Sequence, residues 1–186
     1  MRRDAPTDCD TDEIERGLRR ASLVLVHHRF VELVDVEEVR AAAEHAVRRF
    51  REDFADVLGA AEVHHIGATS LPYGHTKGDV DVNVRVVEPG FAALVAAFDE
   101  RLERAQEENW TATFASFSIS AYGMRFGVQV SVVGSADDFL VALRDRMAAD
   151  PELVLHYDEL KLAAASRGAD HYREAKAAFF EALLEG

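Results

Sequence analysis

The chain has 186 residues, of which 48% are hydrophobic and 30% are charged, a balance that predicts a folded globular protein and excludes a disordered one. Its 21 basic and 34 acidic residues give a net charge of −13, which excludes a generic nucleic-acid binder because that affinity needs clustered Lys and Arg. The single cysteine, Cys9, fits a reducing compartment, and the sequence shows no secretory signal or bilayer-length apolar run. We therefore expect a cytoplasmic protein without membrane contact.

The first third of the chain predicts a tail followed by helices. Residues 1–12 are polar and predict a flexible tail, and acids after Thr11 mark the start of a helix that runs to about His28. Residues 30–36 alternate apolar and charged positions, as in a short strand or arm. Residues 36–58 carry apolar side chains at steps of three and four, which predicts a helix that Gly59 caps.

The middle third predicts a sheet. Strict alternation over residues 79–87 is typical of a strand with one buried face, and residues 62–66 form a shorter strand. Pro89 and Gly90 end the longer strand, and residues 91–106 have a helical period. Residues 110–121 and 125–133 predict two further strands, joined as an antiparallel hairpin at Tyr122-Gly123.

The last third predicts three helices. One begins near Ser135, one begins after Asp150-Pro151 and stops near Gly168, and Asp170 caps the last. The inward side chains expected on the last helix are Ala175, Ala178, Phe179, Ala182 and Leu183. Helices, a small mixed sheet and further helices make an α+β fold, with one domain over residues 13–186.

Two acids on the strand at residues 79–87 are the first indication of chemistry. Val80, Val82, Val84 and Val86 face the core, so Asp79 and Asp81 lie side by side, about 6–7 Å apart along the strand. Adjacent carboxylates repel unless a cation lies between them. Mg²⁺ prefers one or two carboxylates plus phosphate oxygens and water, so the pair predicts a Mg²⁺–nucleotide site, with Mn²⁺ as the alternative ion.

The segment before these acids supplies a complementary phosphate site. Gly67 and Ala68 allow close approach of the backbone, and the hydroxyls of Thr69 and Ser70 can meet phosphate oxygens. Lys77 can neutralise a phosphate. The alternative interpretation of this segment is a strand-to-helix turn in which the hydroxyls cap the next turn. The alternative for Asp79 and Asp81 is a solvated face of the strand. Asn83 and Arg85 are expected to be exposed strand positions, and one of His64 and His65 to be a structural histidine.

These residues resemble a known group. Ile66-Gly67-Ala68 and Asp79-Val80-Asp81 resemble the hydrophobic–glycine–small and acid–hydrophobic–acid signature of the nucleotidyltransferase superfamily. Residues 65–72 are similar to the His-Ile-Gly-Ser-Thr-Ala-Val-Pro stretch of the GrpB family. Further parts of that family are similar to residues 143–147, 150–153 and 172–176, and to Tyr157, Leu160 and Lys161. The resemblance spans roughly residues 31–184 and implies a nucleotidyltransferase-like small mixed β-sheet flanked by helices, with a helical C-terminal part.

The resemblance adds residues to the expected site and shows one difference between this chain and active nucleotidyltransferases. It implies Arg144 and Lys161 as substrate contacts, and Gln129 faces the expected site from the strand at residues 125–133. Active nucleotidyltransferases take a third carboxylate from a neighbouring strand, whereas this strand offers Gln129 and Ser131. GrpB domains also occur fused to dephospho-CoA kinase, but this chain has no Gly-Lys-Ser/Thr phosphate loop and so no kinase half.

Two functions follow as hypotheses. In the first, Asp79 and Asp81 are the catalytic and metal-binding residues of a protein that binds a nucleoside triphosphate and transfers a nucleotidyl group to an unidentified acceptor. Gly67, Ala68, Thr69, Ser70, Lys77, Gln129, Arg144 and Lys161 bind the nucleotide. In the second, the chain is a catalytically inactive nucleotide-binding or accessory module that acts on a protein partner, because the third carboxylate is missing.

Overall fold

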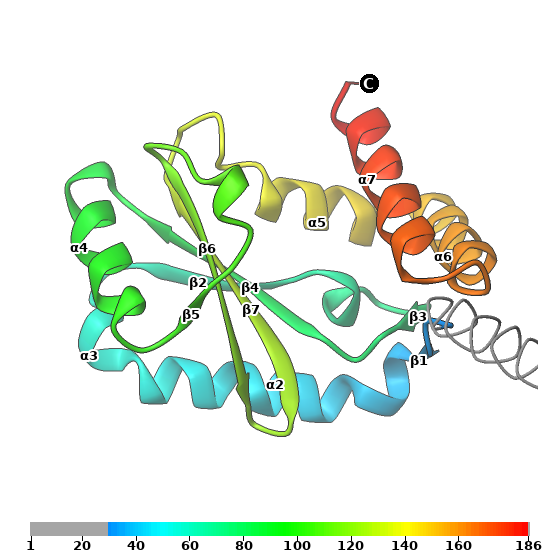
Figure 1. Ribbon diagram of the computed structural model, residues 1–186, viewed down its shortest axis with the longest axis horizontal. Coiled ribbons are helices and arrows are strands. Elements are labelled where there is room, and N and C mark those ends of the chain that lie inside the picture. The colour runs from blue at the N-terminus through cyan, green and yellow to red at the C-terminus, as the bar shows by residue number, and fades with distance from the viewer. Residues whose placement is uncertain (1–29, 186) are drawn as a thin grey trace, which may run out of the picture.

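The computed structural model describes residues 30–185, and its centre is a five-stranded mixed sheet (Figure 1). The strands lie in the order β2 (Glu62–Ile66), β4 (Val80–Val86), β7 (Met124–Val132), β6 (Phe114–Ala121) and β5 (Glu103–Arg104). β4 and β7 are parallel, and the other neighbours are antiparallel. A separate two-stranded sheet pairs β1 (Val34–Asp35) with β3 (His75–Thr76).

Six helices of the described chain surround this sheet. They are α2 (Val36–Asp53), α3 (Ala55–Leu58), α4 (Glu88–Asp99), α5 (Leu140–Ala149), α6 (Pro151–Ala165) and α7 (Ala169–Glu185), and two 3₁₀ turns span Ala68–Ser70 and Glu107–Asn109. The α+β prediction is therefore confirmed. None of the helices between residues 30 and 185 combines the length and the apolar character needed to cross a bilayer.

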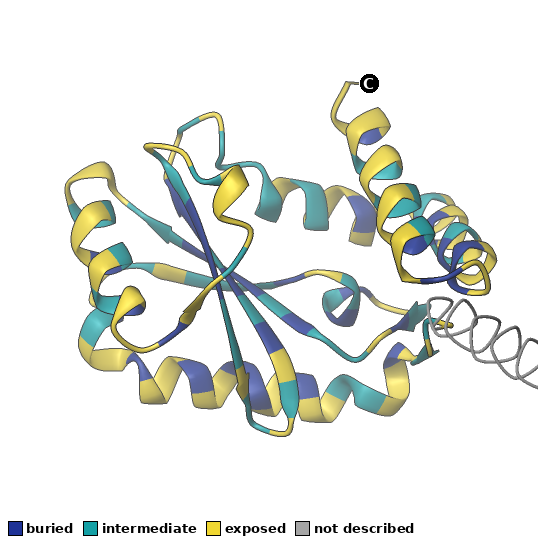
Figure 2. Ribbon diagram, viewed as in Figure 1, coloured by how far each residue is buried: buried dark blue, intermediate teal, exposed yellow. Residues whose placement is uncertain are grey.

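One face of the sheet builds the main core. Val80, Val82 and Val84 of β4 are fully buried, as the alternation predicted. They pack with side chains from α2, α3, α4, β6 and β7, and the centre of this core is aromatic, with Phe50 stacked on Phe126 at 5.1 Å between ring centroids. Figure 2 shows α2 with its buried positions toward the sheet and its exposed positions toward solvent. The opposite face of β4 is thereby left for polar side chains.

The C-terminal helices cover part of that polar face and form a second core. Leu71, Met147, Tyr157 and Leu183 are buried together, with Phe179 and Phe180 packed around them. Leu71 follows the 3₁₀ turn at Ala68–Ser70, so the turn is anchored against α5, α6 and α7. Arg40 of α2 holds the same loop from the other side by donating to the carbonyl oxygens of Leu71 and Pro72.

Several predicted boundaries are confirmed. The expected helix over residues 36–58 is present but divides at Phe54 into α2 and α3, and Gly59 ends it with a φ of 53°. The hairpin turns at Tyr122 and Gly123, whose φ values of 58° and 75° match the twist of the two strands. Asp150 caps α6 by accepting from the backbone N–H groups of Glu152 and Leu153.

Other boundaries differ from the prediction. The helix expected over residues 91–106 begins earlier, with Pro89 in its first turn, and ends at Asp99 because residues 103–104 join the sheet as β5. Asp170 lies inside α7, which starts at Ala169, and Ala178 and Ala182 are exposed. The face that α7 turns inward instead carries Tyr172, Lys176, Phe179, Phe180 and Leu183. The expected tail and the helix at residues 11–28 lie outside the described residues.

Candidate functional site

The turn after β2 and the acid in the middle of the sheet come together, as the sequence hypothesis required. Gly67 has φ 73° and ψ −173°, a conformation that only glycine adopts readily. A β-carbon at this position would lie 2.5 Å from Oδ2 of Asp81. The turn therefore approaches the Asp81 carboxylate closely, and glycine is needed at residue 67 for both reasons.

A second glycine makes room for the same carboxylate from the other side. Asp81 lies opposite Gly127 in the parallel pairing of β4 with β7, and a β-carbon on Gly127 would be 2.5 Å from Oδ1 of Asp81. The side-chain amide of Gln129, two residues further along β7, lies beside Asp81 and favours its ionised form. The Asp81 carboxylate thus occupies a slot between Gly67 of the turn and Gly127 of β7, neither of which has a side chain.

Asp79 and Lys77 form the outer part of the site. Lys77 Nζ lies 2.7 Å from Oδ2 of Asp79, so the lysine already partners one of the two acids. Thr69 donates from its hydroxyl to the backbone carbonyl of Asp79 at 3.1 Å, and His65 Nε2 is 3.0 Å from the same hydroxyl. This chain of contacts fixes the turn against the residues that lead into β4.

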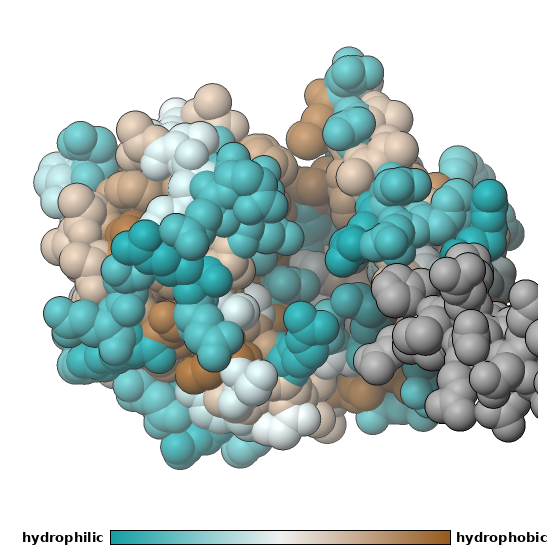
Figure 3. All heavy atoms as spheres, viewed as in Figure 1, coloured by the Kyte–Doolittle hydropathy of each residue, from teal (hydrophilic) through white to brown (hydrophobic). Residues whose placement is uncertain are grey.

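Two cavities meet at these residues. The first, about 440 Å³, is mainly apolar and lies between the sheet and helices α5, α6 and α7. The second, about 550 Å³, is mainly polar and is lined by both Asp79 and Asp81. Figure 3 shows a recess between the part of the molecule that carries the sheet and the C-terminal helices. The side chains common to both cavities are Ala68, Asp81, Gln106, Gln129 and Lys176.

The polar cavity concentrates positive charge in an acidic protein. Lys77, Arg125, Arg173 and Lys176 line it, against the three acids Asp79, Asp81 and Glu103. Arg173 also pairs with Asp170, so the basic side chains roughly balance the acids here, whereas the chain as a whole carries a net charge of −13. An anion is therefore better accommodated here than the overall composition indicates.

Burial shifts the pKa values of the two central charges toward their neutral forms. Burial raises the pKa of the Asp81 carboxyl, which nearby Asp79 raises further and Lys176 opposes. Burial likewise lowers the pKa of the Lys176 ammonium, with Asp81 opposing the shift. Within residues 30–185, Lys176 forms no ion pair within 4.0 Å of an acidic side chain. The site thus holds a lysine with no close ion-pair partner among the described residues, and a carboxyl group whose ionised form gains from that lysine.

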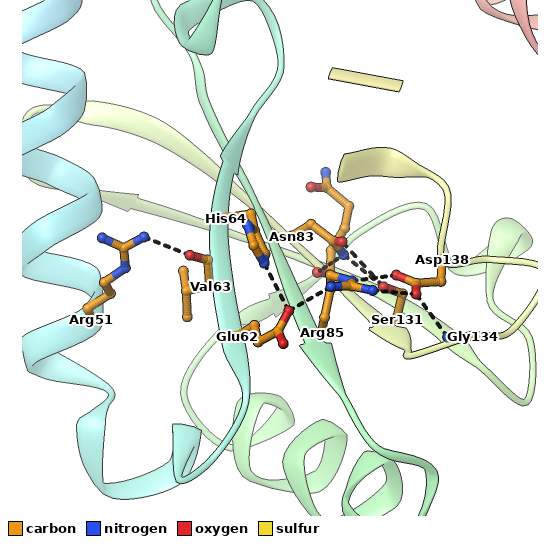
Figure 4. Close-up of polar contacts among 10 residues, drawn as sticks. Arg51, Glu62, Val63, His64, Asn83, Arg85, Ser131, Gly134 and Asp138 are labelled. Carbon is orange, nitrogen blue, oxygen red and sulfur yellow. Dashed lines mark hydrogen bonds and ion pairs between the residues drawn. The ribbon is translucent and has the colours of Figure 1, made fainter. Parts of the chain in front are cut away.

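A polar network supports the far end of the same sheet face. Asn83 is fully buried and donates to Ser131 Oγ at 3.0 Å and to the Gln129 carbonyl oxygen at 3.1 Å. Arg85 binds Asp138 through two hydrogen bonds of 2.6 and 2.7 Å and also meets Glu62 (Figure 4). The expectation that Asn83 and Arg85 are exposed strand positions is wrong, because α5 and the loop before it cover this part of the face.

The predicted site residues fall into two groups. Gly67, Ala68, Lys77, Asp79, Asp81, Gln129 and Arg144 all line one or both cavities. Thr69 and Ser70 line neither, since Thr69 is buried and Ser70 donates to the Gly67 carbonyl oxygen at 2.7 Å. Lys161 also lines neither cavity. It is buried, pairs with Asp158 at 3.1 Å, donates to the His75 carbonyl oxygen and lies over the Tyr157 ring.

Lys176 is the residue whose importance sequence reasoning underestimated. Lys176 belongs to a stretch that resembles the GrpB family, but the sequence alone does not distinguish a phosphate contact from a solvated lysine there. Its spacing of four and three residues from Tyr172 and Phe179 places it on the inward face of α7. That spacing was the available signal.

The site fits a single metal ion better than a pair. Asp79 and Asp81 line the same cavity, which suits Mg²⁺ completed by phosphate oxygens and water. Among residues 30–185, no group of three or more His, Cys, Asp or Glu side chains is arranged to hold a metal. Of the other acids near the sheet, Asp138 and Glu62 bind Arg85, and Asp137 accepts from the hydroxyls of Thr111 and Thr113.

Comparisons with known proteins identify the family of this chain and show a solved structure with the same fold. The family model described as GrpB protein matches residues 33–186. A UPF0157 protein from Vibrio cholerae is 31% identical over 172 residues, which cover 90% of this chain and 88% of that protein. The crystal structure of the conserved protein GrpB from Enterococcus faecalis has the same fold, with a TM-score of 0.62 and 22% identity over 83% of this chain and 98% of that one. The chain therefore belongs to the GrpB family.

Proposed function

We propose that this protein binds a nucleoside triphosphate, with the phosphates in the polar cavity and one Mg²⁺ ion held by Asp79 and Asp81. The observation that carries the proposal is the approach of the Gly67 turn to the Asp81 carboxylate, at the edge of a cavity with four basic side chains. Backbone at a glycine turn and nearby cations are common phosphate ligands. The resemblance of these motifs to the nucleotidyltransferase superfamily points to the same ligand.

The residues of this chain divide the work of binding. Asp79 and Asp81 supply carboxylate oxygens to the metal, and Mn²⁺ would suit the same donors. When bound, the ion neutralises phosphate charge and orients the phosphate chain. Lys77 would then turn from Asp79 toward a phosphate oxygen, since the metal takes over the neutralisation of that carboxylate. Arg144 supports the wall of the site by donating to the carbonyl oxygen of His65.

In the first candidate function, the bound nucleotide also reacts, and a nucleotidyl group is transferred to an acceptor hydroxyl or phosphate. An inactive nucleotide-binding or accessory module is the second candidate. It is favoured by a specific observation: the strand next to Asp81 presents Gly127 and the Gln129 amide where a third carboxylate would be expected. With one fewer carboxylate, a second metal ion would lack a ligand. No carboxylate would be left to act as the general base. In that case, nucleotide binding would regulate how this protein acts on a protein partner in the cytoplasm.

Calorimetric titration with ATP, GTP, CTP and UTP tests the binding proposal. We expect at least one nucleotide to bind in Mg²⁺ and to bind at least tenfold more weakly in EDTA. Asp81→Asn should lose the Mg²⁺-dependent part, whereas Asp56→Asn, which alters a remote acid paired with Arg101, should not. Absence of binding for all four nucleotides would refute the proposal, and thermal shifts should follow RT ln(1 + [L]/Kd) if it is correct.

Pyrophosphate release separates the two candidate functions. The wild-type protein is incubated with each nucleotide, Mg²⁺ or Mn²⁺, and a panel of hydroxyl and phosphate acceptors. Release that disappears in Asp81→Asn supports transfer. Tight binding without release from any nucleotide supports the inactive module.

A further inference from the structure

The apolar cavity beside the phosphate site has the properties of a specific pocket. It has a volume of about 440 Å³ and is lined by side chains such as Ile66, Leu71, Leu140, Leu143, Met147 and Phe180. The polar groups Gln106, Asn109 and Asp137 also line it, and they come from a loop and a 3₁₀ turn outside the C-terminal helices. Apolar walls with a few polar groups are the usual lining of a small-molecule site.

Lys176 marks where this pocket meets the polar cavity. It is the one basic side chain of the described residues that lines both cavities. Its ammonium lies 5.6 Å from the centre of the Tyr172 ring, which supports it from α7 itself. Arg144 also lines the apolar cavity, but its guanidinium donates to the His65 carbonyl oxygen and to Asp145. Lys176 is thus the cation that an anionic group at the junction would meet.

A ligand that fills both cavities must be apolar at one end and anionic at the other. Inorganic polyphosphate would leave the apolar cavity empty, and a free nucleoside would leave Lys176 without an anion. Burial of apolar surface contributes about 25 cal/mol for each Å² removed from water, so occupancy of the apolar cavity would supply much of the affinity. The shape and chemistry of the two cavities therefore favour one ligand lying across the junction.

We propose that the apolar cavity takes the nucleoside part of the ligand and that Lys176 binds the phosphate group nearest to it. This inference rests on the proposed function and adds to it which part of the nucleotide each cavity takes, and so the orientation of the ligand. The base lies among the side chains of α5 and α7, and the phosphate chain runs from Lys176 toward Lys77 and the two acids.

The test compares a nucleoside triphosphate with inorganic tripolyphosphate by calorimetry in Mg²⁺. The wild-type protein should bind the nucleotide at least tenfold more tightly. Leu143→Trp, which fills the apolar cavity, should weaken nucleotide binding at least tenfold and leave tripolyphosphate binding unchanged. Leu162→Trp, at an exposed leucine on α6, is the matched control and should change neither affinity. Lys176→Met should weaken both ligands about tenfold, as loss of a charge-assisted contact does.

The outcomes distinguish this inference from the proposed function. Equal affinity for nucleotide and tripolyphosphate, or an unchanged nucleotide affinity in Leu143→Trp, would overturn the inference while a phosphate site remains. Failure of both ligands to bind the wild-type protein would overturn the proposed function as well. If Leu143→Trp does not fold, the comparison of the two ligands on the wild-type protein decides alone, because it needs no variant.

Discussion

The carboxylate of Asp81 fills the space that a side chain at residue 67 would need, with Oδ2 only 2.5 Å from an ideal β-carbon there. A glycine in the turn after β2 and an acid on β4 are therefore coupled: neither the turn nor the acid can change without affecting the other. The same carboxylate excludes a side chain at Gly127. This coupling makes the centre of the site sensitive to the smallest possible substitution.

Gly67→Ala is expected to destabilise the protein by about 2 to 4 kcal/mol, because it combines a backbone conformation reserved for glycine with a collision against Asp81. Urea unfolding measures the difference. Gly78→Ala is the matched control, since Gly78 also has a positive φ, of 80°, but a β-carbon there would meet nothing within 4 Å. A loss of stability in Gly67→Ala no larger than in Gly78→Ala would show that Asp81 does not restrict the turn.

Asp138→Asn is expected to cost about 2 to 4 kcal/mol, because it leaves the Arg85 guanidinium without its two-pronged partner in a largely buried setting. Only 8% of the Asp138 side chain is exposed, against 22% for Arg85. Asp99→Asn breaks a similar two-pronged pair with Arg104, but those side chains are 34% and 48% exposed, so it should cost much less than Asp138→Asn. Similar losses for the two variants, measured in urea, would contradict this ranking.

The stability of the protein should fall in mild acid because of His65. Burial, together with the charge of Arg144, lowers the pKa of His65 to about 4 from 6.5. Between these values the unfolded chain binds a proton that the folded protein does not, so stability is lost as the pH falls from 6.5 toward 4. The effect between pH 7 and pH 5 is about 1 to 2 kcal/mol.

The measurement compares urea unfolding of the wild-type protein with His65→Gln at the two pH values. Glutamine keeps a donor for the Thr69 hydroxyl but does not titrate in this range. The variant should therefore lose less stability than the wild-type protein on acidification. An identical loss in both proteins would assign the pH dependence to other groups.

Lys161 and Lys176 should give opposite results when each is changed to methionine. Lys161→Met removes the partner of Asp158 and of the His75 carbonyl oxygen, and should cost about 1 to 3 kcal/mol with little effect on nucleotide affinity. Lys176→Met removes an ammonium whose pKa burial already lowers, so stability at neutral pH should be kept while affinity falls. Paired unfolding and calorimetry experiments check both statements, and a loss of affinity in Lys161→Met at full stability would reverse the assignment.

The sequence predicted most of the fold because its strongest signals are local. Alternation predicted the buried face of β4, and the pair Tyr122-Gly123 between two strand-like segments predicted the hairpin between β6 and β7. The end of α4 was missed because Glu103 and Arg104 pair with β6, and that pairing depends on residues far away in the chain. The exposure of Ala178 and Ala182 has a similar origin, since the neighbours of α7 decide which of its faces is turned inward.

The candidate site was predictable in outline but not in its charges. Gly67, Asp79 and Asp81 carry a recognisable spacing, and the structure brings them together. The sequence predicts an exposed Asn83 because its partner, Ser131, lies on another strand and cannot be recognised from the residues near Asn83. The positions of two lysines depend on distant residues in the same way. Lys161, the predicted substrate contact, instead meets Asp158 and His75 in the interior, whereas Lys176 lines both cavities.

The position of Lys176 on α7 has a consequence for the order in which the protein matures on the ribosome. Every strand of the sheet and both acids precede α5 in the chain, so the sheet can form while the last helices are still being synthesised. Lys176 and Phe180, which complete the lining of the apolar cavity, arrive only with α7. A nascent chain can thus complete the sheet while the α7 residues that line both cavities are still missing.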